Sequence, residues 1–467
     1  KITLVQKRAR WPVAEYKCKF DITGTLLPTD LEITNGPAPG SNSSAGMRPS
    51  SRRALREGGW MVRDRLASVS LDFREPFRSS TAAWIGARPE LCGRRYDFLF
   101  DKGIASKCKC WIYSPLEEGE IASRPKFSLG RDEFLAGLGC FHGVEGAKVG
   151  DRVGLAFTAT VPVADMTGLI DVMPEIARNG YAFSDGCGVM GLGIAGTVRD
   201  VLGLDDVPGA VQVRIGGVKG MLVLKHGYPP DRIGVRPSMV KFRSRHRILE
   251  IKGHARARWG RNTRLFKELL LVMDSRGVPC NVFYRLQGRA GAEFALEHEP
   301  GARPDNLPKY LEDVRMRGKR SDGEYFSEDG LASIKAAMEK SKQKVNLRCQ
   351  LTLMQGVIDE HGVLREGEVL VGNGAVVGNV LICRSPCLFP GDIQKAVAVP
   401  GRREEPFPFY GECLVFSSKG QRPLPDKLSG GDLDGDEFYV IYEPDIVNKI
   451  SHAEAHDYGT QSSDVGR

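Results

Sequence analysis

Glycine is the feature that most limits what this chain can fold into. The 467 residues include 55 glycines, nearly twice the average share of about 7%, and the glycines follow no Gly-X-Y period. Because glycine weakens helix interiors and suits tight turns, its position between short apolar runs predicts many short strands rather than long helices. The apolar and charged shares, 41% and 27%, exclude wholesale disorder and a fibrous architecture. The length predicts roughly two to four domains.

Apolar runs and turn residues divide the chain into two β-rich blocks. Strands or strand-rich segments are predicted at 154–163, 211–215, 221–225, 235–242, 347–357, 368–371, 375–383, 414–416 and 438–442. Helices are predicted from a cap at Asn262 and Thr263 through Met273, and from Ser327 to about Lys344. The expected domains are an N-terminal accessory region (1–109) with a flexible loop at 36–53, a first β-rich domain with insertions (110–296), a helical connector (297–345), a second β-rich domain (346–445) and a C-terminal tail (446–467).

The net charge of +8 is unevenly distributed. Residues 219–267 contain 14 Lys or Arg and two acids, whereas residues 426–457 contain nine acids and two lysines. This contrast predicts a surface that binds a polyanion and a carboxylate site that holds cations. The alternative is two solvated faces with no such role.

The cysteines and apolar runs bear on the compartment. Eleven cysteines without paired C-x-x-C spacing argue against a zinc ribbon and against an oxidised secreted framework, so we interpret Cys383 and Cys387 as reduced residues. No apolar run reaches the 18 or so residues of a membrane span, and we find no signal peptide. We therefore expect an intracellular protein, cytoplasmic or nuclear, without a membrane partner.

The sharpest local motif is the acidic string Ser429-Gly-Gly-Asp-Leu-Asp-Gly-Asp436. Asp432, Asp434 and Asp436 would repel one another by about 4 kcal/mol per pair at about 4 Å and an effective dielectric near 20, which indicates a cation such as Mg²⁺ or Ca²⁺. An EF-hand is disfavoured because its sixth position, which requires glycine, holds Glu437. An acidic turn without metal stays an alternative.

A second glycine motif, Gly191-Leu-Gly-Ile-Ala-Gly196, matches the dinucleotide-binding fingerprint literally. That fingerprint requires a buried strand before it and a complete βαβ unit after it. The preceding residues Phe183–Gly188 are interpreted as a turn, and 202–208 is too broken to finish such a unit. We therefore do not predict a nicotinamide site.

The basic zone contains two lysines in settings that suit phosphate contact. Lys219 follows two glycines, and Lys241 lies in a predicted strand, so backbone amides and a rigid ammonium could meet a phosphate. Arg243, Arg245 and Arg247 alternate along the next segment and would line one face of it. Contact with a phosphodiester backbone is the interpretation; a merely solvated lysine is the alternative.

Taken together, the motifs resemble those of the cell-encoded RNA-dependent RNA polymerases of RNA silencing, especially the fungal branch. The resemblance covers about residues 110–445 and is carried, in the family's order, by Phe183–Gly188, Gly217–Gly220, Arg236–Phe242, Ser385–Asp392, Lys419–Pro423 and Ser429–Asp436. It implies a mixed, β-rich (α+β) fold whose catalytic core is two double-psi β-barrels joined by the helical connector. The family's large helical head is not matched, because the chain ends 31 residues after Asp436, so we expect a fragment or a compact variant.

The resemblance also implies roles for particular residues. Asp432, Asp434 and Asp436 would hold the catalytic Mg²⁺, with Mn²⁺ as a possible substitute, while Lys219 and Lys241 would reach the nucleotide phosphates. Nucleotide or RNA contact is expected of a further set: Lys419, Arg422, Arg236 and Arg243.

The resulting hypothesis is template-directed nucleotidyl transfer on a single-stranded RNA template, used for double-stranded RNA synthesis in RNA silencing. A ribose 3′-hydroxyl would attack the α-phosphate of a ribonucleoside triphosphate, and two Mg²⁺ ions would activate the hydroxyl and steady the leaving pyrophosphate. Two alternatives stay open: RNA synthesis on a single-stranded DNA template by the same site, and a non-catalytic RNA-binding protein that retains the fold.

Overall fold

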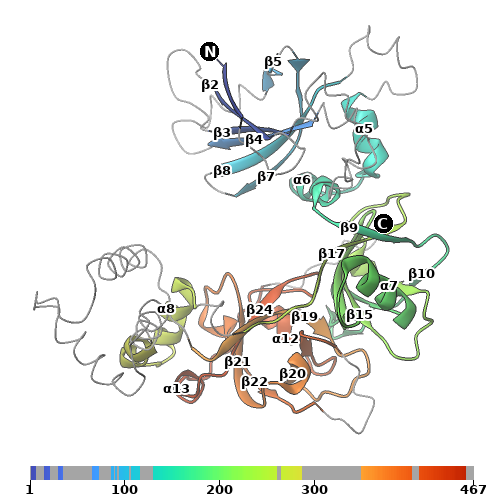
Figure 1. The fold of residues 1–467 in the computed structure, drawn as a ribbon. Coiled ribbons are helices and arrows are strands. Elements are labelled where there is room, and N and C mark those ends of the chain that lie inside the picture. Colours follow the sequence, from blue (N-terminus) through green and yellow to red (C-terminus); the bar gives the residue numbers. More distant parts are fainter. Residues whose placement is uncertain are drawn as a thin grey trace, which may run out of the picture. The chain divides into compact units, whose positions relative to one another are not determined.

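The computed structural model describes residues 2–6, 15–20, 30–34, 66–72, 86–88, 90–91, 94–104, 107–115, 130–259, 265–286, 349–401 and 410–458. These fall into two compact units (Figure 1): residues 1–168 with 213–219 and 240–253, and residues 169–212 with 220–239 and 254–467. The units interleave along the chain, and the linear domain boundaries stay a prediction. The predicted 36–53 loop and the 297–345 connector lie outside the described residues.

The first unit contains a six-stranded antiparallel sheet with the order β1-β2-β3-β4-β8-β7. Its strands are β1 (Ile2–Gln6), β2 (Glu15–Phe20), β3 (Asp30–Thr34), β4 (Leu66–Asp72), β7 (Asp97–Ile104) and β8 (Lys107–Tyr113). Two strands of two residues each, β5 (Glu90–Leu91) and β6 (Arg94–Arg95), pair as a short antiparallel hairpin.

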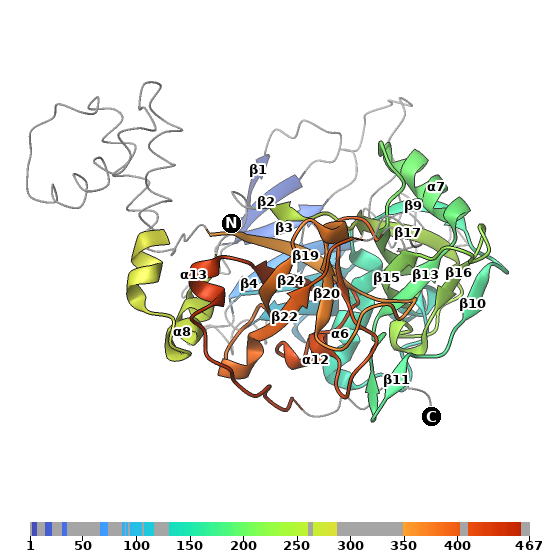
Figure 2. The ribbon, with the colours of Figure 1, turned by 90° about the horizontal axis from the view of Figure 1, so that it is seen from below.

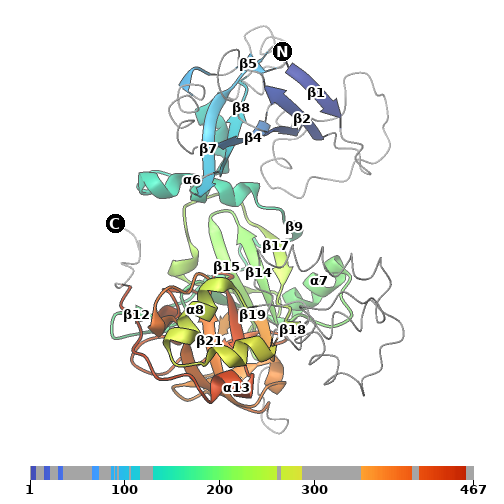
Figure 3. The ribbon, with the colours of Figure 1, turned by 90° about the vertical axis from the view of Figure 1, so that its left-hand side faces the viewer.

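Two helices, α5 (Arg131–Leu138) and α6 (Gly146–Gly154), and the 3-10 helix η1 (Leu155–Phe157) follow this sheet. The helix α6 lies beside β7 (Figure 3). Phe134 and Phe157 pack with Phe100 and Trp111 in one buried aromatic cluster. The prediction of strand at 154–163 is therefore wrong up to Phe157, and strand begins at β9 (Val161–Asp165). The glycines of this segment hid the helical spacing of Val149, Val153 and Phe157, which all join the cluster.

A second sheet has seven strands in the order β10-β16-β13-β15-β14-β17-β9. Besides β9, its strands are β10 (Ile170–Val172), β13 (Cys187–Met190), β14 (Ala210–Ile215), β15 (Val218–Leu224), β16 (Ile233–Val235) and β17 (Ile248–His254). A short hairpin pairs β11 (Ala177–Arg178) with β12 (Tyr181–Ala182), and α7 (Leu192–Leu202) follows β13.

The strand predictions for this sheet succeed in part. The predicted strands at 211–215 and 221–225 are confirmed by β14 and β15. The predicted strand at 235–242 is wrong, because β16 ends at Val235 and a 3-10 helix, η2 (Pro237–Met239), follows. Pro237 has no N–H to donate to a ladder, so the strand cannot continue through it.

The third sheet closes into a barrel within the second unit (Figure 2). Its order is β18-β19-β23-β20-β22-β21-β24, and a further pairing of β19 with β24 joins the ends of a six-stranded ring. The strands are β18 (Arg258–Trp259), β19 (Leu351–Ile358), β20 (Glu368–Val371), β21 (Gly378–Arg384), β22 (Gln394–Ala398), β23 (Leu414–Phe416) and β24 (Glu437–Ile441). The second β-rich block is therefore confirmed, and its short strands agree with the glycine pattern.

The barrel strands alternate between two cores. Phe438 and Val440 on β24 pack with the interior cluster, whereas Ile441 and the β21 residues Leu381 and Cys383 pack outside with the helices α8 (Lys267–Ser275) and α13 (Pro444–Val447). Successive side chains of a strand point to opposite faces, so β21 and β24 are buried on both sides. Short helices η5 (Gly372–Gly374), η6 (Pro390–Asp392) and α12 (Leu424–Lys427) connect the strands.

The start of α8 differs from the sequence prediction. The helix begins at Lys267 with Phe266 at the N-cap, and Phe266 makes no side-chain capping bond. The predicted caps Asn262 and Thr263 lie outside the described residues. Leu269 and Met273 are fully buried in the outer core, so packing of the apolar face sets the position of this helix.

Two further predictions concern the oxidation state of the cysteines and the presence of membrane-spanning helices. The described cysteines are free thiols, and burial raises the pKa of Cys187 to about 12. Within the described segments, we find no helix with the length and apolar character that crossing a membrane requires.

Candidate metal centre and nucleotide-binding residues

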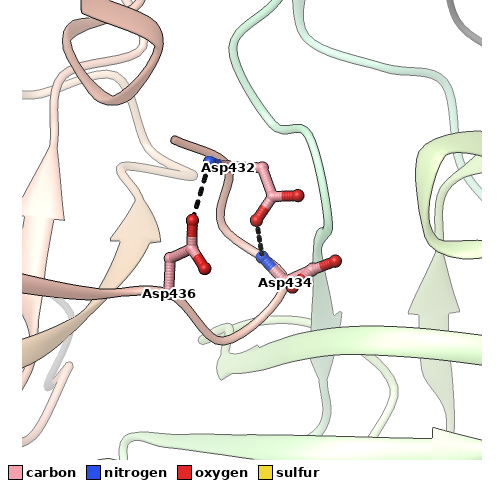
Figure 4. Close-up of side chains that lie close together, drawn as sticks. All are labelled: Asp432, Asp434 and Asp436. Atoms are coloured by element: carbon pink, nitrogen blue, oxygen red, sulfur yellow. Dashed lines mark hydrogen bonds between the residues drawn. The ribbon is translucent and has the colours of Figure 1, made fainter. Parts of the chain in front are cut away.

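The predicted metal loop connects α12 to β24 in the second unit. Ser429 and Gly430 turn the chain through left-handed conformations, with φ of 54° and 61°. One carboxylate oxygen each of Asp432, Asp434 and Asp436 then lies within 4.8 Å of the others (Figure 4). The structure therefore brings the three predicted ligands together.

The loop is held in part by its own carboxylates (Figure 4). The backbone N–H of Asp432 donates to Oδ2 of Asp436 at 3.2 Å, and the N–H of Asp434 donates to Oδ1 of Asp432 at 3.3 Å. Arg384 adds a cation from β21, with its Nε 2.6 Å from Oδ2 of Asp436 and its Nη1 donating to the carbonyl of Ser429. Arg384 thus fixes both ends of the loop and offsets part of its negative charge.

Neighbouring segments of the same unit hold Asp434 from two sides. The N–H of Leu433 donates to the carbonyl of Asp185 at 2.8 Å, and Nε2 of Gln212 donates to the carbonyl of Asp434 at 3.1 Å. Gly186 lies so close that a Cβ added to it would be 2.5 Å from Cβ of Asp434. Its φ of +81° also favours glycine. Both the close contact and the backbone conformation therefore require glycine at position 186.

The donor set fits a hard divalent cation. At separations within 4.8 Å, each pair of carboxylate charges repels by at least about 3.5 kcal/mol at an effective dielectric of 20, and the ion pair with Arg384 offsets part of the charge of Asp436. Carboxylate oxygens are the ligands that Mg²⁺ prefers. Asp434 is 4% exposed, whereas Asp432 and Asp436 are half-buried. One carboxylate is therefore enclosed by protein, and the other two stay accessible to a cation and to a substrate that would share it.

The EF-hand alternative does not fit the surrounding fold. The strand β24 begins at Glu437, directly after the loop, where an EF-hand would continue its loop toward a helix. Glu443, at the twelfth position, is 4% exposed and accepts a hydrogen bond from the N–H of Gln350. Its carboxylate therefore serves the barrel rather than the loop.

Lys219 and Lys241 lie in the first unit, on segments that pair with each other. Val218 and Val240 form an antiparallel bridge, and the N–H of Lys241 donates to the carbonyl of Gly217 at 2.9 Å. Because side chains alternate across paired segments, the two lysines share the face opposite the valines. Lys219 is on β15, whereas Lys241 lies outside a regular strand, contrary to prediction; their contact with phosphates stays a prediction.

Arg236 has a different place from the one predicted. Its side chain is 2% exposed, and it forms a bidentate pair with Glu360, Nη1–Oε1 2.7 Å and Nη2–Oε2 3.0 Å. It also donates to the carbonyls of Pro174 and Cys187. Burial disfavours the charged guanidinium and lowers the pKa of Arg236. The hydrogen bonds to Glu360 and its negative charge have the opposite, larger effect, so that the pKa of Arg236 is raised. In this structure Arg236 therefore stabilises the fold through a buried ion pair, and its predicted contact with nucleotide or RNA stays a prediction.

The other basic candidates are more accessible. Lys419 is exposed, as is Arg243, which lies in the first unit with Arg245 and Arg247. Arg422 is half-buried, because its Nε donates to Oδ2 of Asp426 and its Nη2 donates to the carbonyl of His456. Exposure permits RNA contact at Lys419 and Arg243, and these roles stay predictions.

The fingerprint match at Gly191–Gly196 needs a correction of its context. A buried strand, β13, does precede it and α7 follows. The turn predicted at Phe183–Gly188 is confirmed for 183–186, and its last two residues begin β13. However, the N–H of Ile194 at the helix start donates to the carbonyl of Pro230, and a Cβ at Gly191 would be 1.9 Å from the carbonyl oxygen of Pro229. These glycines thus admit another segment of the chain to the position that a pyrophosphate takes in a dinucleotide site.

A protein-family model matches most of this chain. The family model for "RNA dependent RNA polymerase" matches residues 68–466. The chain therefore belongs to the RNA-dependent RNA polymerase family, and the predicted family is confirmed.

Individual relatives agree. RNA-dependent RNA polymerase 6 of Arabidopsis thaliana is 29% identical over 437 residues, covering 81% of this chain and 34% of the relative. RNA-dependent RNA polymerase 1 of Schizosaccharomyces pombe is 27% identical over 352 residues, covering 65% and 28%. The chain thus spans about one third of the length of the curated relatives it matches.

A solved structure shows the same fold. The RNA-dependent RNA polymerase QDE-1 from Thielavia terrestris matches with a TM-score of 0.69 and 24% identity, covering 88% of this chain and 52% of that one. The mixed, β-rich fold class with its barrel core is thereby confirmed, and the fungal branch stays a prediction.

Sequence reasoning missed two side chains of this site. Arg384 directly precedes the matched segment Ser385–Asp392, and a cation at that border was a usable signal. Gln212 offered none, since it lies within a strand whose other residues are buried. Only its pairing across the fold assigns it to Asp434.

Proposed function

We propose that this chain is the catalytic core of a polymerase that transfers ribonucleotides from ribonucleoside triphosphates to an RNA 3′-hydroxyl on a single-stranded RNA template, in double-stranded RNA synthesis for RNA silencing. The observation that carries the proposal is the three-carboxylate loop Asp432–Asp436 on a closed barrel. Family membership supports the reaction type.

Asp432, Asp434 and Asp436 would hold a divalent cation, Mg²⁺ or its substitute Mn²⁺. When bound, the cation supplies Lewis-acid stabilisation of phosphate oxygens and favours ionisation of the attacking hydroxyl. Arg384 orients Asp436 through its 2.6 Å ion pair. The carbonyl of Asp185, which accepts from the N–H of Leu433, and the side-chain amide of Gln212, which donates to the carbonyl of Asp434, keep Asp434 in place. These contacts thus hold the three carboxylates in place around the position of the cation. A cation held in this way could position a phosphoryl group precisely.

Lys219, Lys241, Lys419, Arg422 and Arg243 are proposed to contact nucleotide or RNA phosphates. Cationic side chains neutralise the charge that develops on phosphate oxygens during transfer, and exposed arginines bind a phosphate backbone without reading its sequence. The exposure of Arg243 supports this role.

The test is incorporation of labelled ribonucleotides on single-stranded RNA in Mg²⁺. We expect incorporation by the wild-type chain and none by Asp434→Ala, with RNA binding retained. Asp205→Ala is the matched control, because Asp205 is exposed in a turn after α7, and it should behave as wild type. Normal incorporation by folded Asp434→Ala would overturn the proposal.

The same assay decides between the remaining hypotheses. A matched single-stranded DNA template measures whether the site also accepts a DNA template, and we expect RNA to support at least equal incorporation. RNA binding with a steep salt dependence but no pyrophosphate release from the wild-type chain would instead identify a non-catalytic RNA-binding protein.

A further inference from the structure

Glu175 lies in the second unit, just before the β11–β12 hairpin, and bridges two segments that are distant in sequence. Its Oε2 accepts a 2.6 Å hydrogen bond from Oγ of Ser184, and its Oε1 accepts a 2.9 Å hydrogen bond from the N–H of Ser238. Bonds to a carboxylate are about twice as strong as neutral ones. One half-buried side chain therefore clamps the turn 183–186 to the 3-10 helix η2.

The clamp continues to the backbone of Gly186. The Oγ of Ser238 accepts a 2.9 Å hydrogen bond from the N–H of Gly186, while the carbonyl of Gly186 accepts from the N–H of Met221. Both backbone hydrogen-bonding groups of Gly186 are thus satisfied. Ser184, at the other end of the clamp, is fully buried, and its Oγ also accepts from the N–H of Ile176.

Gly186 and its neighbour carry the clamp to the metal loop. The carbonyl of Asp185 accepts the N–H of Leu433 at 2.8 Å, and the Gly186 backbone lies directly against the Asp434 backbone. A shift of the 185–186 peptide therefore displaces Asp434, because the contact leaves no space between them. Glu175 reaches the metal loop only through these intermediates.

The geometry assigns to Glu175 the role of a positioning residue that sets the divalent-cation affinity of the Asp432–Asp436 loop. The inference rests on the proposed function of that loop as the cation site. Groups hydrogen-bonded directly to metal ligands typically change affinity by about 10- to 100-fold when they are removed. Glu175 acts through Ser238 and Gly186, so we expect its effect at the lower end of this range.

The experiment measures Mn²⁺ binding by electron paramagnetic resonance, alongside ribonucleotide incorporation as a function of Mg²⁺ concentration. For Glu175→Ala we expect about tenfold weaker Mn²⁺ binding, a similar rise in the Mg²⁺ concentration for half-maximal incorporation, and recovery of incorporation at high Mg²⁺. The KM for nucleotide at saturating Mg²⁺ should change less than about twofold, because Glu175 does not belong to the proposed phosphate contacts.

Three further variants separate positioning from general damage. Glu175→Gln keeps an acceptor for the N–H of Ser238 and should restore near-wild-type Mn²⁺ affinity. Ser238→Ala removes the acceptor for Gly186 and should reproduce the Glu175→Ala defect. Glu268→Ala, at an exposed glutamate in the first turn of α8, is the matched control and should leave Mn²⁺ binding unchanged.

The outcomes distinguish this inference from the proposed function. Wild-type Mn²⁺ affinity in folded Glu175→Ala overturns the inference while leaving the polymerase proposal intact. Weakened Mn²⁺ binding in a chain that incorporates no nucleotide supports the inference and overturns the polymerase proposal. If the wild-type chain binds no Mn²⁺, the inference fails, because Glu175 then has no cation site to position.

Discussion

Glu360→Gln should destabilise the second unit strongly. The Arg236 and Glu360 side chains are each 2% exposed and form two hydrogen bonds of 2.7 and 3.0 Å, and Nζ of Lys225 lies 3.8 Å from the same carboxylate. The substitution preserves the size of the side chain but leaves Arg236 buried without its paired carboxylate. Breaking a buried pair in this way costs about 3–5 kcal/mol, out of a typical total stability of about 5–15 kcal/mol.

The measurement is urea unfolding followed by circular dichroism, together with thermal melting. At about 2–4 °C per kcal/mol, the expected fall in Tm is roughly 6–20 °C. Arg232→Met is the matched control, because its bidentate pair with Asp171 is about one third exposed, and exposed pairs contribute about 1 kcal/mol or less. Combining Arg236→Met with Glu360→Leu should recover part of the loss, since no unpaired charge is left inside.

Two results would refute the structural role of Arg236. One is a loss below about 1 kcal/mol in Glu360→Gln, which would mean that the pair is not desolvated. The other is a stable Arg236→Met protein whose RNA affinity falls while Arg232→Met binds RNA normally. The second result would return Arg236 to the nucleotide or RNA contacts that the sequence predicted.

Three further predictions concern the metal loop, acid stability and RNA contact. Gly186→Ala should reduce incorporation by about 100-fold, because a Cβ would overlap the Asp434 backbone and a displacement near 1 Å can have that effect; incorporation within threefold of wild type would contradict this. Hydrogen bonds from Arg232 and Tyr228 lower the pKa of Asp171 to about 2. The stability from this carboxylate is therefore present above its ordinary value of 3.8 and lost as the pH falls toward 2, so Tm should drop less in Asp171→Asn than in wild type between pH 5 and pH 2.5, and equal drops would refute it. Arg243→Gln should reduce the salt-dependence slope of RNA binding by about 1, measured by filter binding, and an unchanged slope would exclude a phosphate contact at Arg243.

Local patterns predicted the elements whose causes are local. The strand β20 was predicted with its actual bounds, Glu368–Val371, because an apolar run between turn residues contains all the information needed. The metal ligands lie within five consecutive residues, so a single local turn can bring their carboxylates within 4.8 Å of one another. The helix α6 was not predicted because glycines interrupt its apolar face in the sequence. That face is recognised only in the structure, where Val153 and the following Phe157 pack in one cluster with Phe100.

Nonlocal pairing decided what the sequence left open. Arg236 followed the pattern of an RNA-binding residue, but its partner Glu360 is 124 residues away, and only tertiary burial makes that pair structural. Likewise, Gly191 fits a phosphate-binding fingerprint, but the fold brings the Pro229 carbonyl to that helix start.

The sequence by itself determined the family, the short-strand character and the carboxylate loop, because glycine spacing and an i, i+2, i+4 set of aspartates act over a few residues. The tertiary structure decided which groups hold that loop: Arg384 from β21, Gln212 from β14 and the Asp185–Gly186 peptide. The physical reason is that a carboxylate's position depends on hydrogen bonds and close contacts from whatever segments the fold places beside it, and the choice of those segments is set by the burial of apolar strands rather than by the residues of the loop.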